Sequence, residues 1–526
     1  MLHPLYYDRL TIAALATLAV VAARAPPPET EYHSYVGDPQ VPTNVNDAEL
    51  DAPFWTNQAQ AALRARHNSI EQGGIAKNVI LYLGDGMSVP TLAAARALLG
   101  QRNQRPGEEA QLSFEKFPIV GLSKTYCVND QVADSACSAT AYLCGVKANR
   151  GTLGVTARVA RGNCTASLAA ETRVASVAAW ALAAGKDVGI VTTTRITHAS
   201  PAGTFAHSAD RGWENDAALG SGVDPNQCPD IAEQLVHHFP GKDFKVILGG
   251  GRRNFRPTMA GGLRQDGRNL IEEWREDKRR RGLSAVYADN ARELRAANLD
   301  NTEYLMGLFS ESHATYNLER DHDMDPSLTE LTEAALKILR RSKNGFFLFV
   351  EGGRIDHAHH SNRIELALDE TVEFASAVEA GSNLEDTLVV VTADHAHVMS
   401  YNGYSPRGHD ILGPARQTDR DRVPYMTLSY TNGPGFRPHN AQGRRDDPTA
   451  ESTYGSLLWR SHVDVPLGSE THGGDDVAVF AKGPQQHVFT GLYEQSQIPH
   501  LIGFAACLGD GLHSQPCMAR TSKPTN

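Results

Sequence analysis

The chain lacks an excess of basic residues, because its 50 Lys and Arg residues are outnumbered by 61 Asp and Glu residues. The formal net charge of −11 at pH 7 argues against nucleic acid as a general partner. The one basic run, at residues 278–281, follows Glu276 and Asp277, and we interpret it as a solvated helix face. We also find no internal repeat and no low-complexity tract of consequence.

Long apolar runs are rare as well. Arg9, the apolar residues 10–23 and the small residues around Ala25 form the pattern of a signal peptide at residues 1–25, which is too short for a convincing spanning helix. No other segment has the length or apolarity to cross a membrane. Residues 518–526 are polar, so no lipid-anchor signal is visible. We therefore expect a secreted, extracellular protein without a membrane span.

Cysteines are few, with seven in 526 residues. In the oxidising compartment that a signal peptide implies, several of them should pair, and the odd count leaves at least one free. Cys507 and Cys517 are near enough in sequence to close a short loop. Asn163 begins the sequence Asn-Cys-Thr, which makes it a candidate glycosylation site in a secreted chain.

Short apolar runs recur along the chain, and helical stretches such as residues 165–184 and 364–380 lie between them. Runs of this kind are typical of strands that are buried on both faces. Their alternation with helices predicts an α/β fold with a large, mostly parallel central sheet and helices on both faces. The runs lie at residues 78–83, 186–191, 245–248, 345–350, 387–391 and 477–480.

The predicted sheet and helices do not fill the whole chain evenly. We expect an N-terminal arm and helix at residues 26–70, the α/β core at 71–400 and its completion at 470–517. Between them, at 401–469, Gly, Pro, Arg and Asp are frequent and no long apolar run occurs, so we expect an inserted subdomain there. A polar tail at 518–526 completes the division.

Metal-capable side chains follow several of the predicted strands. Asp85, Glu351 and the pair Asp394-His395 each come directly after an apolar run. Any one of them could be an ordinary turn residue. Ligands of open α/β sheets bind beyond the carboxyl ends of the strands, however, and four such side chains at one edge favour a metal site.

The stretch from residue 351 to 360 is the densest cluster of potential ligands. Asp356 and His360 are four residues apart, a spacing that lets two side chains on one helical face bind one metal ion. A His-rich run is more often adventitious, but its position after a buried strand favours function. A pair of zinc ions needs about six ligands. The sequence offers Asp85, Asp356, His360, Asp394, His395 and His472.

Ser135 is a candidate nucleophile. It follows Asp134 among small residues, where a turn could lead into the first turn of a helix. Unpaired backbone N–H groups and the helix dipole favour an anion at such a position, including a phosphoryl group on the serine. Taken alone, the simpler interpretation is that Asp134 or Ser135 caps the helix.

These motifs, in this order, resemble those of animal-type alkaline phosphatases from about Phe54 to Cys517. The resemblance implies the hydrolysis of small phosphate monoesters through a phosphoserine formed on Ser135. The motifs that carry it are Leu83-Gly-Asp85-Gly-Met87, Asp134 to Gly145, Thr192 to Arg195, His198 to Gly203 with Arg211, Phe346 to His360, Val391 to His397 and Glu470-Thr-His472.

The same resemblance implies three metal ions. The first zinc ion would be held by Asp356, His360 and His472, and it would activate the water that hydrolyses the phosphoserine. The second would be held by Asp85, Asp394 and His395 next to Ser135. A magnesium ion would be held by Asp85, Ser200 and Glu351, with His198 behind it. Arg211 would bind two phosphate oxygens, which suits its planar fork.

Further features follow from the resemblance. It implies a homodimer, with the insertion at 401–469 forming a crown near the dimer axis. It implies the disulfides Cys164–Cys228 and Cys507–Cys517, makes Cys127 and Cys137 a candidate further pair, and would then leave Cys144 free. Vertebrate members carry a calcium-type site, but Ser310 stands where an acid would be expected, so we do not expect calcium.

Other functions remain as alternatives at this point. A sulfatase of the same superfamily would need a Cys-x-Pro-x-Arg pattern, which the residues after Ser135 lack. A phosphodiesterase of the superfamily would typically use Thr as nucleophile and would not combine Ser200, Glu351 and Arg211. A non-catalytic binding protein on the same scaffold is the third alternative, although none of the expected ligands has been lost.

Overall fold

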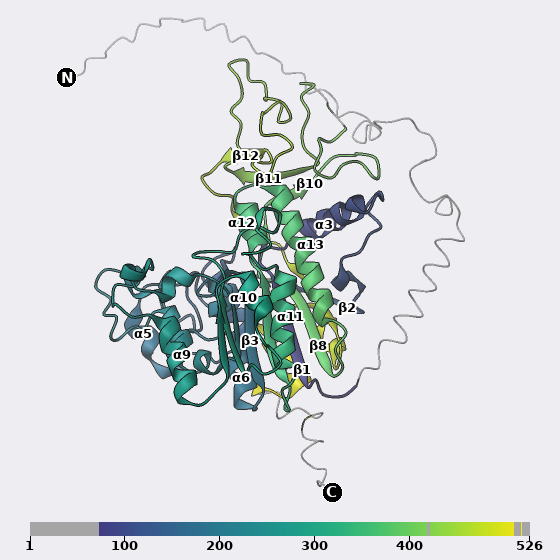
Figure 1. The fold of residues 1–526 in the computed structure, drawn as a ribbon. Coiled ribbons are helices and arrows are strands. Elements are labelled where there is room, and N and C mark those ends of the chain that lie inside the picture. The colour runs from purple at the N-terminus through teal and green to yellow at the C-terminus, as the bar shows by residue number, and fades with distance from the viewer. Residues whose placement is uncertain (1–72, 417, 419–420, 510–516, 518–526) are drawn as a thin grey trace, which may run out of the picture. The chain divides into compact units, whose positions relative to one another are not determined.

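The computed structural model describes residues 73–416, 418, 421–509 and 517 (Figure 1). The described residues all belong to one compact unit. The expected signal peptide at 1–25, N-terminal arm at 26–70 and polar tail at 518–526 lie outside the described residues. Those three assignments therefore stay predictions.

A ten-stranded central sheet organises the fold, with the strand order β15-β2-β14-β8-β1-β7-β3-β4-β6-β5. From β8 to β5 every neighbouring pair is parallel, and β14 joins that block antiparallel to β8. The predicted mostly parallel sheet is thus confirmed. Its strands are β1 (Asn78–Gly84), β2 (Ile119–Lys124), β3 (Asp187–Arg195), β4 (Val246–Gly250), β5 (Ala285–Ala288), β6 (Tyr304–Leu308), β7 (Phe346–Gly352), β8 (Thr387–Ala393), β14 (Val477–Lys482) and β15 (Gly491–Glu494).

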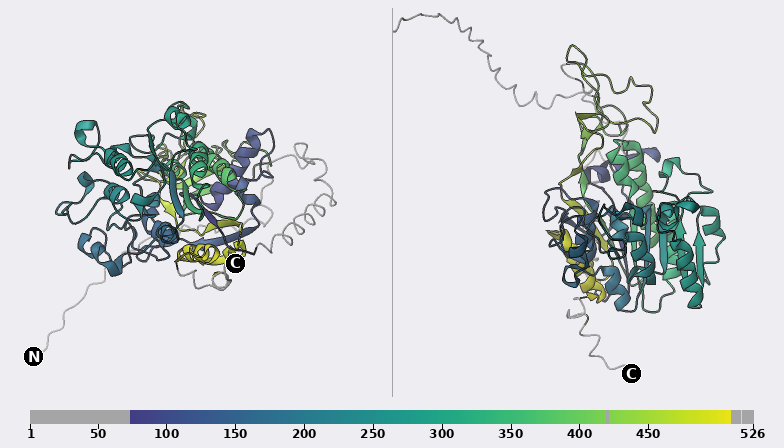
Figure 2. Two further views of the ribbon diagram at one scale, coloured as in Figure 1. Left: turned by 60° about the horizontal axis from the view of Figure 1, so that its bottom comes forward. Right: turned by 90° about the vertical axis from the view of Figure 1, so that its left-hand side faces the viewer.

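Helices cover both faces of the sheet, as its apolar strands require. Ile80 and Tyr82 of β1 pack into one hydrophobic cluster, while their neighbours Val79 and Leu81 pack into another. The first cluster includes α3 (Val89–Arg102), α10 (Ala291–Ala296), α11 (Leu328–Leu339) and α13 (Ile364–Gly381). The second includes α4 (Ser135–Cys144), α6 (Val177–Ala183), α7 (Ala199–Ala202), α8 (Ile231–His237), α9 (Leu270–Arg280) and α14 (Ile498–Ala506). Figure 2 shows the layers from two further directions.

The prediction of one continuous helix at residues 165–184 is wrong, because the structure interrupts it. The helix predicted at 364–380 closely matches α13. In place of the helix at 165–184 there are α5 (Cys164–Leu168), a 3-10 turn and α6. The break occurs because Arg173 pairs with Val155 in an isolated β-bridge. The hydroxyl of Ser176 then accepts the N–H of Ala179 at 3.1 Å and starts α6 afresh.

Residues 401–469 are the segment in which the sequence predicts an inserted subdomain. Their described part contains no α-helix, and it contributes most of a separate three-stranded sheet. The strands of that sheet are β10 (Met399–Tyr401), β11 (Leu428–Gly433) and β12 (Val463–Pro466). The interpretation of this segment as a crown subdomain stays a prediction.

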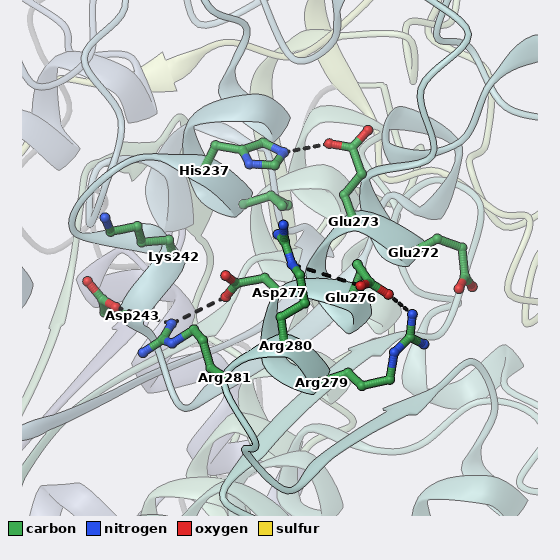
Figure 3. A pocket seen from close by; sticks show the side chains of 11 residues that line it. His237, Lys242, Asp243, Glu272, Glu273, Glu276, Asp277, Arg279, Arg280 and Arg281 are labelled. Carbon is green, nitrogen blue, oxygen red and sulfur yellow. Dashed lines mark hydrogen bonds and ion pairs between the residues drawn. The ribbon is translucent and has the colours of Figure 1, made fainter.

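The basic run at 278–281 ends α9 and is only partly a solvated face. Lys278 is fully buried and its ammonium donates to the carbonyl oxygen of Lys242 at 2.8 Å, so the expectation is wrong for this residue. The arginines are exposed and line a cavity of about 880 Å³ together with α8 (Figure 3). Within its lining, Arg281 lies 3.2 Å from Asp277, and His237 lies 2.7 Å from Glu273. Such mutual pairing is typical of a charged surface.

Candidate active site

Ser135 is the first residue of α4, at the turn-to-helix junction that the sequence predicts. Asp134 caps the helix, since its Oδ1 accepts the N–H of Cys137 at 3.2 Å. The capping role therefore belongs to Asp134, and the hydroxyl of Ser135 is left to face another group. Its Oγ lies 3.3 Å from Nε2 of His395, and the serine is almost fully buried.

The ends of β1, β7 and β8 bring the acidic ligands to one edge of the sheet. In the parallel register, Leu83 lies beside Glu351 of β7 and beside Thr392 of β8. Asp85 follows β1, and Asp394 with His395 follows β8. The structure thereby assembles three groups of potential metal ligands, each with its ligand atoms within 4.8 Å of one another. They are Asp356 with His360, His397 and His472; Asp85 with Asp394 and His395; and Asp85 with His198 and Glu351.

The first group joins α12 (Arg354–His360) to the two short strands β9 (Ala396–His397) and β13 (His472–Gly473). Oδ1 of Asp356 lies 3.3 Å from Nε2 of His360 and 3.3 Å from Nε2 of His472. The Nδ1–H of His360 donates to the carbonyl of Glu470 at 2.5 Å, and that of His472 donates to Ala133 at 2.7 Å. Both rings therefore present Nε2 to the same point, as metal-binding histidines do.

His397 is a member of this group that sequence reasoning did not assign to the site. Its Nε2 lies 2.7 Å from Asp356 and its Nδ1 lies 2.5 Å from Glu470. Burial acts to lower the pKa of His397, but the two carboxylates outweigh it and raise the pKa to about 10. The charged ring orients Asp356. The available signal was its position two residues after His395, on the same strand-like segment.

The second group, Asp85, Asp394 and His395, is completely buried. Nε2 of His395 lies 3.1 Å from Asp394 and 3.4 Å from Asp85. Oδ1 of Asp394 accepts the backbone N–H groups of Gly86 and of His395, each at 2.9 Å. The rings of His395 and His472 stack with their centroids 3.6 Å apart, so the first two groups are immediate neighbours.

The third group surrounds Glu351. One oxygen of Glu351 accepts the hydroxyl of Thr194 at 3.0 Å and that of Thr192. Within the described residues, several other buried polar atoms have no hydrogen-bond partner, which is costly unless a ligand satisfies them. These atoms are both carboxylate oxygens of Asp85, Oε1 of Glu351, Oγ of Ser200 and Nδ1 of His198. The oxygens suit a hard cation such as magnesium.

Electrostatics favour cations in the second and third groups. Burial raises the pKa of Asp85, and the charges of Asp394, Asp356 and Glu351 raise it further. Burial also raises the pKa of Asp394, and that of Glu351 to about 7. Burial lowers the pKa of His395 well below its usual value, which leaves a neutral imidazole. Crowded buried carboxylates and neutral imidazoles are the forms that bind divalent metals, so the residues fit such ions.

Arg211 contacts Asp134, the neighbour of Ser135, and is held by two groups. Its Nη1 donates to Oδ2 of Asp134 at 2.8 Å, and its Nη2 lies 3.1 Å from Nε2 of His198. Burial acts to raise the pKa of Asp134, but Arg211 and backbone N–H groups outweigh it and lower the pKa. Asp134 is thus an ionised anchor that caps α4 and orients the guanidinium at the same time.

A family model described as alkaline phosphatase matches residues 76–508 of the chain. The chain belongs to the alkaline phosphatase family. Its activity is accordingly the hydrolysis of phosphate monoesters, and the alternatives of a phosphodiesterase or a non-catalytic binding protein gain no support.

Several alkaline phosphatases are similar to this chain over most of their length. A protein of Bombyx mori named membrane-bound alkaline phosphatase is 57% identical over 492 residues, covering 91% of this chain and 89% of its own. The tissue-nonspecific alkaline phosphatase of Homo sapiens is 45% identical, covering 91% and 93%. The solved structure of the Thermus thermophilus enzyme is 26% identical with a TM-score of 0.59, covering 84% and 93%.

The cysteines of this alkaline phosphatase family member pair as the resemblance implied. Disulfides join Cys164 to Cys228, Cys507 to Cys517 and the candidate pair Cys127 to Cys137. Cys144 is free and buried. Asn163 is exposed, although its side chain also caps α5 by accepting the N–H of Ala166 at 3.1 Å. Among the described residues, no helix is long and apolar enough to cross a membrane.

Proposed function

We propose that the chain hydrolyses phosphate monoesters in two in-line displacements, with Ser135 as the nucleophile and a phosphoserine as the intermediate. The observation that carries this proposal is the position of Ser135. It begins α4, its Oγ is 3.3 Å from His395 of the second ligand group, and its neighbour Asp134 holds Arg211. A nucleophile, an arginine fork and divalent-ion ligands therefore meet at one edge of the sheet.

Positioning and charge stabilisation are the main tasks in phosphoryl transfer. Arg211 offers a planar fork to two phosphoryl oxygens, and Asp134 fixes the orientation of that fork. The N-terminus of α4 directs the positive end of its dipole to the same place. Burial of Ser135 keeps bulk water away from the intermediate, so that hydrolysis occurs only where a water molecule is positioned.

We further propose zinc for the first two ligand groups and magnesium for the third. Asp356, His360 and His472 would hold one zinc ion, and Asp85, Asp394 and His395 the other. Asp85, Ser200 and Glu351 would hold magnesium, with His198 behind them. When bound, these ions supply positive charge for the phosphoryl oxygens and lower the pKa of the oxygen nucleophiles.

The test is hydrolysis of a chromogenic phosphate monoester from pH 6 to 11. The wild-type chain is compared before chelation, after chelation and after zinc and magnesium are returned, and then with Ser135→Ala. We expect activity above neutral pH that chelation abolishes, that the metals restore and that the substitution nearly eliminates. Ser176→Ala is the matched control, because Ser176 is also a buried serine at a helix N-terminus.

Two outcomes would overturn the proposal. If Ser135→Ala kept its activity while correctly folded, another group would be the nucleophile. If the folded, metal-loaded wild-type chain were inert on monoesters, a diester substrate would be the next to try.

We also infer an extracellular location. The signal-peptide pattern at residues 1–25 and three disulfides support it, because disulfides persist in oxidising compartments. Expression of the full chain in animal cells should place the enzyme outside the cytosol. It should also give a glycosidase-sensitive mass that Asn163→Gln abolishes. Recovery of the chain in the cytosol with free thiols would contradict this inference.

The resemblance supports a homodimer. Light scattering during gel filtration should then give nearly twice the mass of the 57.0 kDa chain. A mass near that of a single chain at micromolar concentration would contradict the proposal.

A further inference from the structure

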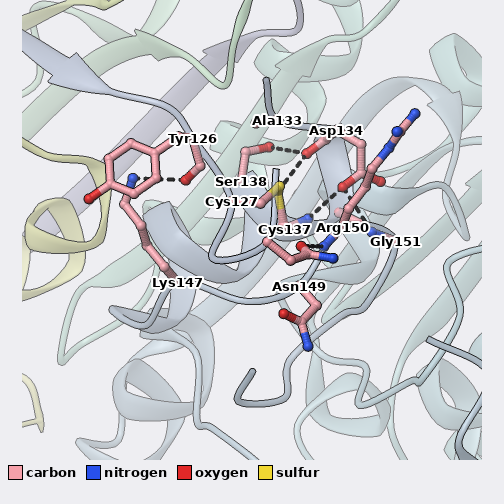
Figure 4. Close-up of a disulfide and its surroundings, with 12 residues drawn as sticks. Tyr126, Cys127, Ala133, Asp134, Cys137, Ser138, Lys147, Asn149, Arg150 and Gly151 are labelled. Carbon is pink, nitrogen blue, oxygen red and sulfur yellow. Dashed lines mark hydrogen bonds between the residues drawn. A yellow bond between two sulfur atoms is a disulfide. The ribbon is translucent and has the colours of Figure 1, made fainter. Parts of the chain in front are cut away.

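The disulfide Cys127–Cys137 encloses the nucleophile. Its sequence separation is 10, so Ser135 lies inside the loop that it closes. Figure 4 shows the bridge with Ala133 and Asp134 next to it. Both cysteines are 2% exposed and pack with Ala133 and Ala148 in a small apolar cluster of their own. The bridge thus lies inside the protein, next to the junction between the β2–α4 connection and α4.

Three contacts of this loop reach the active site, and each reaches a different part of it. The carbonyl oxygen of Ala133 accepts the Nδ1–H of His472, which belongs to the first ligand group, at 2.7 Å. Oδ2 of Asp134 binds Arg211 at 2.8 Å. Oγ of Ser135 lies 3.3 Å from His395 of the second ligand group. Three consecutive residues therefore orient the metal ligand His472, orient the guanidinium of Arg211 and carry the nucleophilic hydroxyl.

Little regular structure holds the loop in place. Residues 127–134 belong to no helix or strand, and Val128 is 55% exposed. Besides the contacts with the active site, described backbone N–H groups make three polar contacts between the loop and residues 148–151. They are Val128 N–H to the carbonyl of Ala148 at 3.0 Å, Arg150 N–H to Oδ1 of Asn129 at 2.8 Å and Gly151 N–H to Oδ1 of Asp134 at 3.0 Å. The disulfide supplies the covalent connection, because it joins the start of the loop to Cys137 in the first turn of α4.

We propose that the Cys127–Cys137 disulfide positions the catalytic loop, holding Ala133, Asp134 and Ser135 in register with His472, Arg211 and His395. The inference rests on the proposed role of Ser135. The bridge acts through other residues, above all Asp134, whose Oδ1 accepts the N–H of Cys137. Loss of the bridge should therefore weaken phosphate binding and turnover rather than remove the nucleophile.

The chain contains a matched control for this proposal. Cys507–Cys517 has the same sequence separation of 10. Both cysteines line a cavity with Lys77 and Asp386, which precede β1 and β8, so this bridge lies at the sheet edge opposite to the active site. Loops of equal length restrict the unfolded chain equally, so removal of either bridge should change that contribution to stability to a similar extent. A difference in kcat/KM between the two variants would then result from the position of the bridge and not from the length of the loop that it closes.

The experiment compares Cys127→Ala/Cys137→Ala with Cys507→Ala/Cys517→Ala in the full, metal-loaded chain. The readouts are kcat, KM and the inhibition constant of inorganic phosphate, which reports the arginine fork directly. For the first variant we expect a loss of kcat/KM on the order of ten- to a hundredfold and weaker phosphate inhibition, as misplacement of a catalytic group predicts. For the second variant we expect kcat/KM to change by less than about twofold, because the substituted residues lie far from the active site.

A double-mutant cycle with Asp134→Asn tests the pathway of the effect. If the bridge acts through Asp134, the loss from Asp134→Asn should be smaller in the Cys127→Ala/Cys137→Ala background than in wild type. If the losses of kcat/KM from Asp134→Asn and from removal of the bridge were fully additive, the proposal that the bridge acts through Asp134 would be overturned. Wild-type kinetics in the bridge variant would also overturn it, because the disulfide would then contribute to stability alone.

Reduction of the folded enzyme gives a second measurement that needs no variant to fold. A water-soluble phosphine reduces the bridge to two thiols and is itself oxidised to the phosphine oxide, with the oxygen atom and the two protons coming from water. Mass spectrometry identifies the reduced pair, with chelator-free buffer and saturating zinc throughout. Activity should fall in step with reduction of Cys127–Cys137 and not with that of Cys507–Cys517. The proposed function fails separately, through activity of Ser135→Ala with all bridges intact.

Discussion

The Nε2 atoms of His360 and His472 lie 3.1 Å apart, although 112 positions separate the two residues in the chain. Each atom is also 3.3 Å from the same oxygen of Asp356. In each ring the Nδ1–H group already donates to a backbone carbonyl, so the lone pair is on Nε2. The two Nε2 lone pairs are therefore directed at each other. A shared cation with bonds of about 2.0–2.1 Å resolves this arrangement.

Removal of one of these rings should therefore release a metal ion. We expect His472→Ala to lose about one zinc ion per chain on gel filtration and at least a hundredfold in kcat/KM, because a catalytic ion is gone. Elemental analysis of the purified protein measures the first effect and a monoester assay the second. The control is His487→Ala, an exposed histidine nearby in the sequence. Unchanged zinc content in His472→Ala would refute the ligand assignment.

Arg211→Lys tests the arginine fork. A lysine offers a single ammonium in place of a planar guanidinium, so it cannot bind Asp134, His198 and two phosphoryl oxygens together. We expect the inhibition constant of inorganic phosphate to rise on the order of tenfold or more, with a parallel loss of kcat/KM. Arg437→Lys removes a comparable bidentate pair with Glu451 in the 401–469 segment and should leave both values unchanged. Equal effects of the two substitutions would refute the role of Arg211.

Glu370 on α13 should make stability depend on pH. Burial raises the pKa of this carboxyl from 4.5 to about 8 while its Oε1 accepts the N–H of Asn317 at 2.7 Å. Between these two values the unfolded chain releases the proton and the folded chain keeps it, so stability falls as pH rises through that window. Glu370→Gln is neutral at every pH, so relative to wild type it should gain stability on the order of 3 kcal/mol between pH 5 and pH 9.

Urea unfolding of Glu370→Gln and wild type at both pH values, at equal metal loading, measures this difference. Glu379→Gln, an exposed position on the same helix, is the control and should show no such change. A Glu370→Gln difference that is the same at pH 5 and pH 9 would contradict the raised pKa.

Cys144 should be the one reactive thiol, and only after unfolding. All seven cysteines of the sequence are described, six of them are in disulfides, and burial raises the pKa of the Cys144 thiol to about 12. Because the thiolate is the reactive form, a thiol reagent at pH 8 should label none in the folded protein. It should label one per chain in denaturant without reductant and seven after reduction. More than one thiol before reduction would show that a bridge is missing.

The sheet and its acidic edge were predictable because they depend on local patterns. Apolar runs ending in Asp85 or Asp394 predict parallel strands whose carboxyl ends meet, and the structure brings these residues together. His397 was missed because its role depends on Glu470, 73 residues away, and on the antiparallel pairing of β9 with β13. Lys278 was misread for a related reason, since its partner is a backbone carbonyl in another element.

The break in the predicted helix at 165–184 has the same origin. Its residues favour a helix locally, but Arg173 pairs with Val155, and that bridge overrides propensity.

The most direct measurement of the central claim is the stereochemical course at phosphorus. The full, metal-loaded chain would transfer the phosphoryl group of an isotopically chiral phosphate monoester to an alcohol acceptor. Each in-line displacement inverts the configuration. A phosphoserine on Ser135 requires two displacements, so the account predicts net retention. Net inversion would show a single direct displacement and would contradict it.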